Sequence, residues 1–336
     1  MYVEIRQIDV ERAFFMRCLI TGVAGFIGSH LAERLLAEGH EVWGIDNFVE
    51  YYPRAIKERN LEGARSWERF TFFERDLLDP ASGLHTLLDG MEWVFHLAAQ
   101  AGVRASWGRD FARYIDNNIV ATQRLLEALA TSQSLRRFVY ASSSSIYGEH
   151  GCSPLTEDTL PRPHSPYGVS KLAAEHLCLT YHRNFDLPVV LLRYFSVYGP
   201  RQRPDMALHR FCKAIVEGEP LSIFGDGGQS RDFTFISDIV EASVRAATAE
   251  QAIGKALNIA GGTHTTLCEV LDLLREINGR PLTITHEQAR PGDVHDTLAD
   301  TSRAAGLLGY TPQVALSDGL ARQFASILDL YAHRTG

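Results

Sequence analysis

The chain has 336 residues, of which 45% are hydrophobic and 22% charged. These values are typical of a globular protein with a sizeable core and about two domains. The 41 acidic residues outnumber the 33 basic ones, giving a formal net charge of −8. This balance disfavours a nucleic-acid partner, which needs a concentrated basic surface, although a few arginines could hold an anionic small molecule. The five cysteines are scattered and no apolar run reaches the length of a membrane span, so we expect a cytoplasmic protein with reduced thiols and no membrane partner.

Residues 1–15 are irregular and precede a second methionine, so we expect an N-terminal extension outside the fold. From residue 16 onward, short apolar runs alternate with stretches of helical periodicity. Strands are predicted over residues 17–21, 41–46, 70–73, 93–97, 137–141 and 189–193, and helices over residues 29–38, 115–130 and 166–184. This alternation predicts an α/β fold with a doubly wound parallel sheet and right-handed crossovers.

A glycine-rich segment, TGVAGFIG at residues 21–28, joins the first predicted strand to the first helix. Gly22 permits a tight turn, Gly25 lets a pyrophosphate approach the backbone, and Gly28 lets the helix pack closely on the strand. Unpaired N–H groups at the helix N-terminus suit phosphates. Asp46 ends the next strand, where its carboxylate can accept hydrogen bonds from ribose hydroxyls and would repel a 2′-phosphate. The segment therefore predicts a Rossmann domain that binds NAD rather than NADP.

Further ligand contacts are expected at the carboxyl ends of the later strands, because doubly wound sheets bind ligands there. Four serines at residues 142–145 follow the fifth strand, and an ordinary polar turn is the alternative interpretation. Asp76 follows the third strand, where it could contact adenine or be a solvated loop residue. The other expected cofactor contacts are Phe26, Ile27, Asn47, Leu77, Leu97, Ala98, Ala99 and Ser142.

The segment SPYGVSK at residues 165–171 predicts the start of a helix, because Ser165 suits the N-cap and Pro166 the first helical position. Tyr167 and Lys171 are four residues apart and therefore share one helical face. A phenol has a pKa of about 10 and needs nearby positive charge to act as a base at neutral pH. The Lys171 ammonium and a nicotinamide ring would both favour the phenolate. The pattern predicts acid–base catalysis by Tyr167, although such a pair also occurs by chance on many helices.

Several motifs follow one another from residue 16 to the end of the chain. They are TGVAGFIG, HLAAQAGV (96–103), SSSSIYG, YGVSK, RYFSVYGP (193–200), RDFTFISD (231–238) and RPGD (290–293). With them the chain resembles the extended short-chain dehydrogenase/reductase family, specifically its nucleotide-sugar epimerases and dehydratases. The resemblance implies a catalytic set of Ser143, Tyr167 and Lys171, tightly bound NAD, no metal, and a homodimer formed through the helices at 115–130 and 166–184. It also implies cofactor contacts by Asn117, or alternatively Asn118, and by Tyr194 on the nicotinamide side. We expect the NAD-binding Rossmann domain over residues 16–195 and a smaller C-terminal α/β lobe for a UDP-sugar over residues 196–336, with an interleaved boundary.

Within this family, the residues after the catalytic serine separate the reactions. Dehydratases carry an Asp-Glu pair there and UDP-glucuronate decarboxylases carry a Glu, whereas this chain has Ser144 and Ser145. The stretches 46–52 and 203–207 are most similar to those of UDP-glucuronate 4-epimerases, and Ser196 stands where UDP-glucose 4-epimerases usually have Asn. The resemblance implies epimerisation of UDP-glucuronate to UDP-galacturonate: Tyr167 takes the 4-OH proton while a hydride passes to NAD, and both return to a 4-keto intermediate.

The intermediate expected from a glucuronate is a β-keto acid, which loses carbon dioxide when its carboxylate bond aligns with the carbonyl. An epimerase must prevent that alignment, and the residues expected to hold the carboxylate are Ser144, Ser145, Ser196 and Arg203. A solvated loop charge is the alternative for Arg203. The expected UDP contacts are Arg231 and Arg290 at the diphosphate, Phe224 against uracil or else in the core, and Ala207 and Asp293.

Three other functions stay open at this point. A UDP-glucose 4-epimerase would use the same catalytic set on a neutral sugar. A UDP-glucuronate decarboxylase would release a pentose product. An NAD-sensing regulator on the same fold would be no enzyme, but such proteins commonly lose the Tyr or the Lys, and this chain keeps both.

Overall fold

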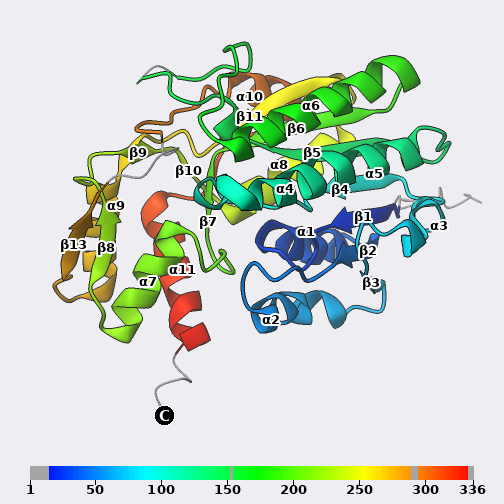
Figure 1. The fold of residues 1–336 in the computed structure, drawn as a ribbon. Coiled ribbons are helices and arrows are strands. Elements are labelled where there is room, and N and C mark those ends of the chain that lie inside the picture. Colours follow the sequence, from blue (N-terminus) through cyan, green and yellow to red (C-terminus); the bar gives the residue numbers. More distant parts are fainter. Residues whose placement is uncertain (1–14, 152–153, 289–293, 332–336) are drawn as a thin grey trace, which may run out of the picture.

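The computed structural model describes residues 15–151, 154–288 and 294–331, and a seven-stranded parallel sheet lies at its centre (Figure 1). The strand order is β11-β6-β5-β4-β1-β2-β3. The strands are β1 (Arg17–Thr21), β2 (Glu41–Asp46), β3 (Phe70–Glu74), β4 (Trp93–His96), β5 (Arg137–Ser143), β6 (Val189–Tyr194) and β11 (Lys255–Ile259). The order reverses between β1 and β4, and the doubly wound α/β fold predicted from the sequence is confirmed.

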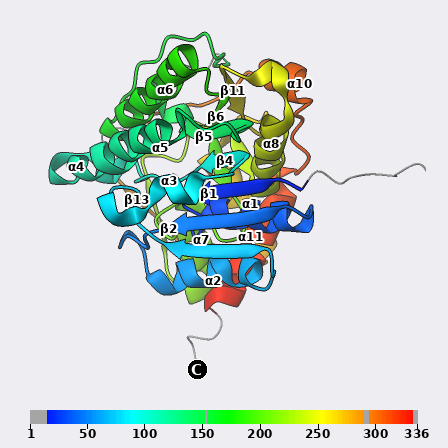
Figure 2. The same ribbon diagram turned by 90° about the vertical axis from the view of Figure 1, so that its right-hand side faces the viewer.

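Helices cover both faces of this sheet (Figure 2). They are α1 (Phe26–Ala37), α2 (Arg54–Arg65), α3 (Leu84–Leu88), α5 (Ala121–Leu129), α6 (Pro166–Phe185) and α8 (Ile236–Thr248). Along β1, Cys18 and Ile20 pack into the apolar cluster on the α1 and α8 face, and Leu19 packs into the cluster on the α5 and α6 face. Side chains of a strand alternate between its two faces, so a strand buried on both sides is apolar throughout.

The part of the chain beyond residue 195 consists of helices and short two-stranded sheets, together with α8 and β11 of the main sheet layer. Besides α8, its α-helices are α7 (Ala207–Glu217), α9 (Leu267–Asn278), α10 (Ser302–Leu308) and α11 (Leu316–Tyr331). Its two-stranded sheets pair β7 (Ser196–Tyr198) with β10 (Phe233–Phe235), β8 (Leu221–Phe224) with β13 (Ile284–Glu287), and β9 (Ser230–Arg231) with β12 (Thr265–Thr266). β13 begins at Ile284, within the alternating sequence LTIT at residues 282–285, and pairs with β8.

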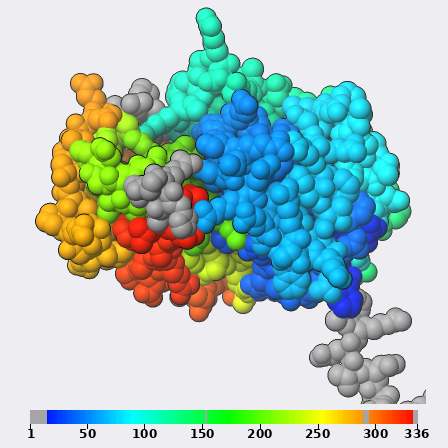
Figure 3. Space-filling view, turned by 90° about the horizontal axis from the view of Figure 1, so that it is seen from below, coloured from blue at the N-terminus to red at the C-terminus, as the bar shows by residue number. Residues whose placement is uncertain are grey.

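The two parts of the chain are interleaved, because β11 returns to the main sheet and pairs with β6. α8 packs against β5 and β6 and therefore also belongs to this layer. In the space-filling view from below, the blue N-terminal part and the green-to-red second part lie side by side (Figure 3). Among the described residues, no helix is long and apolar enough to cross a bilayer. The predicted N-terminal extension lies outside the described residues, apart from Phe15.

The helix predicted over residues 115–130 is not one regular α-helix. A short α4 (Phe111–Tyr114) leads into a π-helical stretch, Ile115–Val120, which precedes α5. Such wide turns are frequent at functional sites. Here the turn carries Asn118, whose buried amide donates to the Gln100 carbonyl at 3.0 Å and to Ser170 Oγ at 2.8 Å. Asn118 thereby ties the loop after β4 to α6.

Candidate active site

A cavity of about 1410 Å³ lies where the carboxyl ends of the main-sheet strands meet the second part of the chain. Its walls come from the segments that follow β1 to β6 and from residues of the second part, among them Arg203, Phe224 and Arg231. Parallel sheets bind ligands at this edge, where the strand order reverses. The volume exceeds the ~300–1,000 Å³ of a typical small-molecule pocket, so it can hold two nucleotide-sized ligands together.

The glycine loop has the close packing that a dinucleotide requires. Gly22 has φ 73°, and a Cβ added there would lie 2.8 Å from the backbone nitrogen of Ala98. A Cβ on Gly28 would lie 2.3 Å from the carbonyl oxygen of Gly22. Side chains are therefore excluded where the loop approaches β4 and where α1 packs on the loop. The N-terminus of α1 stays open to phosphate groups.

Asp46 lies at the end of β2, beside this loop, and its side chain is buried. Its carboxylate accepts hydrogen bonds from the N–H groups of Ala24 at 3.1 Å and Phe48 at 2.9 Å, and the Lys57 ammonium lies 4.0 Å away. Burial raises the pKa of Asp46, while Lys57 and the two N–H donors act in the opposite direction. The glycine loop and this carboxylate together fit NAD, with lone pairs of Asp46 still available to ribose hydroxyls.

All residues predicted to contact the cofactor lie on the wall of this one cavity. Asp76 is oriented there by the Asn47 amide, which donates to its carboxylate at 3.1 Å. Tyr194 presents its ring, because its hydroxyl is hydrogen-bonded to Ser243 at 2.8 Å on α8. Ser142 donates to Glu175 at 2.5 Å. These positions agree with the expected contacts, whose individual roles stay predictions.

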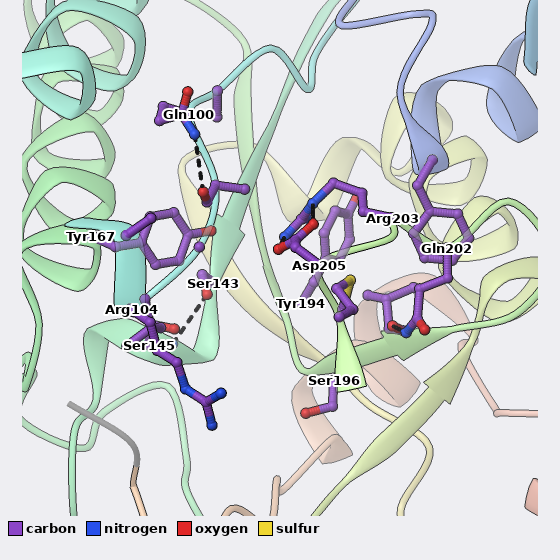
Figure 4. Close-up of a pocket in the computed structure, with 18 of the residues that line it drawn as sticks. Gln100, Arg104, Ser143, Ser145, Tyr167, Tyr194, Ser196, Gln202, Arg203 and Asp205 are labelled. Carbon is purple, nitrogen blue, oxygen red and sulfur yellow. Dashed lines mark hydrogen bonds and ion pairs between the residues drawn. The ribbon is translucent and has the colours of Figure 1, made fainter. Parts of the chain in front are cut away.

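Two of the three predicted catalytic residues lie on the first turns of α6. Ser165 caps this helix, accepting from the N–H of Gly168 at 3.1 Å, as the sequence predicted. Tyr167 and Lys171 both line the cavity from the same helical face. In Figure 4 the Tyr167 ring projects from α6 toward Ser143 at the end of β5. The predicted catalytic set is thus brought together at one point.

Burial dominates the proton affinities of these groups. It raises the pKa of Tyr167, against which a hydrogen bond with Ser143 and the positive charge of Arg203 both act. Burial lowers the pKa of Lys171 to about 8, and its ammonium lies 4.6 Å from the centre of the Tyr140 ring. Without the positive nicotinamide ring, the site therefore favours a neutral phenol and an easily deprotonated amine.

Arg203 reaches into the cavity from the opposite wall (Figure 4). Its guanidinium donates to Asp205 through Nε at 2.9 Å and Nη2 at 3.0 Å, and Tyr51 donates to the same carboxylate at 3.3 Å. Arg203 is therefore not the solvated loop charge that the sequence left as an alternative. Ser144, Ser145 and Ser196 also line the cavity.

Three residues of this site were missed by sequence reasoning. Tyr51 and Asp205 belong to stretches that carried the family resemblance, which was the one signal available for them. Arg104 carried no signal, yet it lines the cavity and its guanidinium lies 4.1 Å from the centre of the Phe224 ring. Phe224 thus faces the cavity, as expected for a contact to a base, but Arg104 covers part of its ring.

The remaining predicted substrate residues are only partly described. Arg231 and Ala207 line the cavity, and Arg231 donates to the carbonyls of Ser230 at 2.7 Å and His295 at 2.9 Å. Arg290 and Asp293 lie outside the described residues. Within the described part of the chain, no group of His, Cys, Asp and Glu side chains could hold a metal ion.

Comparison with known proteins identifies the family of this chain. The family model described as "NAD dependent epimerase/dehydratase family" matches residues 18–260, and the chain belongs to this family. The family resemblance inferred from the motifs is therefore confirmed, and NAD is the cofactor.

Two relatives and one solved structure extend the comparison. The "Uncharacterized UDP-glucose epimerase YtcB" of Bacillus subtilis (strain 168) is 46% identical over 317 residues, which are 94% of this chain and 99% of that protein. A "UDP-glucuronate 4-epimerase" of Thermodesulfobacterium geofontis is 38% identical over 308 residues, 90% of this chain and 94% of that protein. The structure of a UDP-glucuronic acid 4-epimerase from Bacillus cereus, in complex with UDP-glucuronic acid and NAD, has a TM-score of 0.91 and 46% identity, covering 94% of this chain and 100% of that one.

Proposed function

We propose that the protein is an NAD-dependent 4-epimerase that interconverts UDP-glucuronate and UDP-galacturonate. One observation carries the choice of substrate: Arg203 extends into the cavity that holds Tyr167 and Ser143, together with Ser144, Ser145 and Ser196. A guanidinium and several hydroxyls suit a carboxylate at C6 of the sugar. The named activities of the relatives in Thermodesulfobacterium geofontis and Bacillus cereus support the same substrate.

The catalytic residues supply proton transfer at the 4-hydroxyl. When bound, NAD supplies the hydride acceptor and donor at C4. Tyr167 takes the 4-OH proton as phenolate and later returns it to the oxygen of the 4-keto intermediate. Ser143 lies beside Tyr167, where its interaction lowers the pKa of the phenol, and it would orient the Tyr167 hydroxyl. Lys171 lies one helical turn away, where its positive charge favours the phenolate.

The residues expected around the substrate carboxylate explain why the reaction would give epimerisation without loss of water or carbon dioxide. Ser144 and Ser145 follow the catalytic serine, so no carboxylic acid stands there to protonate a leaving group. Arg203 and the serines would hold the substrate carboxylate so that its bond to C5 does not align with the C4 carbonyl. The β-keto acid then keeps its carboxylate until it is reduced.

A UDP-glucose 4-epimerase is the second candidate, favoured by the name of the Bacillus subtilis relative and by Asp205, which offsets the charge of Arg203. Incubating the purified protein with each UDP-sugar, without added NAD, and identifying the products separates the candidates. We expect UDP-galacturonate from UDP-glucuronate. UDP-galactose from UDP-glucose alone would select the second candidate, a UDP-pentose would indicate a decarboxylase, and no product from either sugar would indicate an NAD-sensing regulator.

We also infer a homodimer in the cytoplasm. α6, one of the helices expected at the dimer interface, exposes Val169 and Phe185, with 49% and 52% of their surfaces accessible. A partner chain packed along α6 would remove these apolar side chains, near its two ends, from water. Sedimentation equilibrium of the purified protein would show a mass of two chains, and a monomer would contradict the inference.

A further inference from the structure

Resting on the proposed function, we propose that Asp205 is a positioning residue: it holds one edge of the Arg203 guanidinium so that the other edge faces the substrate carboxylate. Asp205 lines the same cavity as Tyr167, just before the N-terminus of α7. It is not a catalytic residue, because it would act on the substrate only through Arg203.

The geometry of the pair leaves one side of the guanidinium available. Arg203 donates hydrogen bonds from Nε–H and one Nη2–H to the two carboxylate oxygens of Asp205, at 2.9 and 3.0 Å. A guanidinium has five N–H donors in a rigid plane, so both Nη1–H groups and the second Nη2–H remain. That free edge can bind a second carboxylate through two parallel hydrogen bonds. Asp205 and a substrate carboxylate can therefore occupy Arg203 simultaneously.

The pair is itself anchored on its other side. Tyr51 donates to Asp205 Oδ2 at 3.3 Å, and it comes from a segment 154 residues earlier in the chain. Its hydroxyl packs against Gly102, where φ is 107° and a Cβ would lie 2.3 Å from the Tyr51 oxygen. The Tyr51 hydroxyl is thus confined between Gly102 and Asp205. This contact restricts where the Asp205 carboxylate can point.

The backbone that carries Arg203 is also fixed. Gln202, the preceding residue, is buried, and its side chain donates to the Val197 carbonyl at 2.9 Å. The same amide accepts from the N–H of His209 at 3.0 Å and from Gln323 of α11 at 2.7 Å. With the backbone held by Gln202, the remaining freedom of Arg203 lies in its long side chain, and Asp205 restricts that freedom.

Positioning matters here because the competing reaction depends on an angle. The C5–C6 bond joins the sugar ring to the carboxylate. This bond can break when it stands perpendicular to the plane of the C4 ketone, because it then overlaps with the π-orbitals of the carbonyl. Carbon dioxide then leaves, the electron pair moves into the C4–C5 enolate, and C5 takes up a proton to give a 4-keto pentose. A guanidinium fixed at one edge holds the plane of the bound carboxylate, whereas a freely rotating guanidinium attracts it without fixing its angle.

The two roles of Asp205 have opposite effects on binding. Its negative charge repels the substrate carboxylate, while its hydrogen bonds orient Arg203 toward it. Asp205→Asn removes the charge and weakens the orientation, so KM for UDP-glucuronate should change by less than about threefold, as for other partly exposed ion pairs. The ratio of UDP-pentose to UDP-galacturonate should rise by about tenfold, within the ~10²-fold that misplacing a bound group can cost.

The experiment compares the product ratio of the wild-type protein with that of Asp205→Asn, using UDP-glucuronate and chromatographic separation of the UDP-sugars. Tyr51→Phe removes only the supporting hydrogen bond and should give a smaller rise. Asp272→Asn is the matched control, because it breaks a local ion pair with Arg275 on the exposed side of α9, away from the cavity. This control should leave the product ratio unchanged.

An unchanged product ratio in Asp205→Asn would overturn the inference, whether or not KM changes, because a purely electrostatic or structural role moves KM or stability alone. A ratio that rises equally in Asp272→Asn would also overturn it. Failure of the proposed function would look different: the wild-type protein itself would form no UDP-galacturonate from UDP-glucuronate.

Discussion

Replacing Arg203 by Ala tests whether the cavity is built for a sugar that carries a carboxylate. The change removes a charge-assisted contact to that group, typically worth about 1.5–3 kcal/mol. It also leaves Asp205 without its ion-pair partner, and two like charges about 4 Å apart in a wet site repel by about 1 kcal/mol. The combined loss of about 2.5–4 kcal/mol corresponds to roughly a 60- to 700-fold fall in kcat/KM for UDP-glucuronate.

One consequence of the change is common to all substrates. The positive charge of Arg203 lowers the pKa of Tyr167, so its removal makes the catalytic phenol harder to ionise. UDP-glucose lacks the carboxylate and should show only this shared loss. The ratio of kcat/KM for the two UDP-sugars, measured side by side, therefore isolates the effect on the carboxylate. We expect that ratio to fall by the full 60- to 700-fold computed above, with a UDP-pentose appearing among the products.

A double variant provides the control for the repulsion. Arg203→Ala with Asp205→Ala removes the unpaired carboxylate and should recover roughly fivefold of the activity on UDP-glucuronate, equivalent to about 1 kcal/mol. Equal losses on both UDP-sugars in the single variant would refute the reasoning, since Arg203 would then serve the diphosphate or the fold. If the double variant were no more active on UDP-glucuronate than the single variant, repulsion by Asp205 would not contribute to the loss.

Three further outcomes are expected. Tyr167→Phe should lower kcat by roughly 10²–10⁴-fold with an unchanged melting temperature, because it deletes one catalytic hydroxyl; near-native turnover would contradict the mechanism. Denaturing the purified protein should release NAD or NADH, because the hydride is recycled, whereas activity that depends on added NAD would contradict tight retention. The pKa of Lys171 is about 8 in the folded protein against 10.5 for a free side chain. The unfolded chain therefore binds more protons between these values, so the stability of the NAD-free protein should rise by up to roughly 3 kcal/mol from pH 8 to pH 10.5. The free energy of unfolding, measured with urea, should show this rise in the wild type and not in Lys171→Met. An equal dependence on pH in the two proteins would contradict the prediction.

The main sheet could be predicted because its signals are local. The strands β1 to β6 are short apolar runs separated by helical periodicity, and their predicted ends fall within two residues of the observed ones. The strand β11 was missed, because KALNI is one short apolar run among several and its place depends on pairing with β6. The π-helical stretch was missed because its hydrogen bonds differ from those of an α-helix while the apolar spacing around it looks helical.

The candidate site likewise contains residues that could be predicted from the sequence and contacts that could not. Gly22, Ser143 and Tyr167 stand at strand and helix ends, where the chain order alone predicts that they meet. The ion pair of Arg203 with Asp205 is also local, yet only the structure shows that it faces the cavity and that Tyr51 joins it. Contacts between distant segments leave no periodic signal in one sequence. The arrangement of residues on the side of the cavity opposite Tyr167 therefore could not be predicted from the sequence.

The charges of the cavity bear on how the proposed base forms when NAD is bound. Burial raises the pKa of Tyr167, so the phenol is neutral in the protein alone, and it lowers that of Lys171 to about 8. A cationic nicotinamide ring nearby favours the phenolate, which means that the base forms where a hydride acceptor is present. Across the cavity, Asp205 offsets the charge of Arg203 in a similar way, while a free guanidinium edge remains for a carboxylate. In the proposed mechanism, proton removal by Tyr167 therefore depends on bound NAD, and the free edge of Arg203 stays available for the substrate carboxylate.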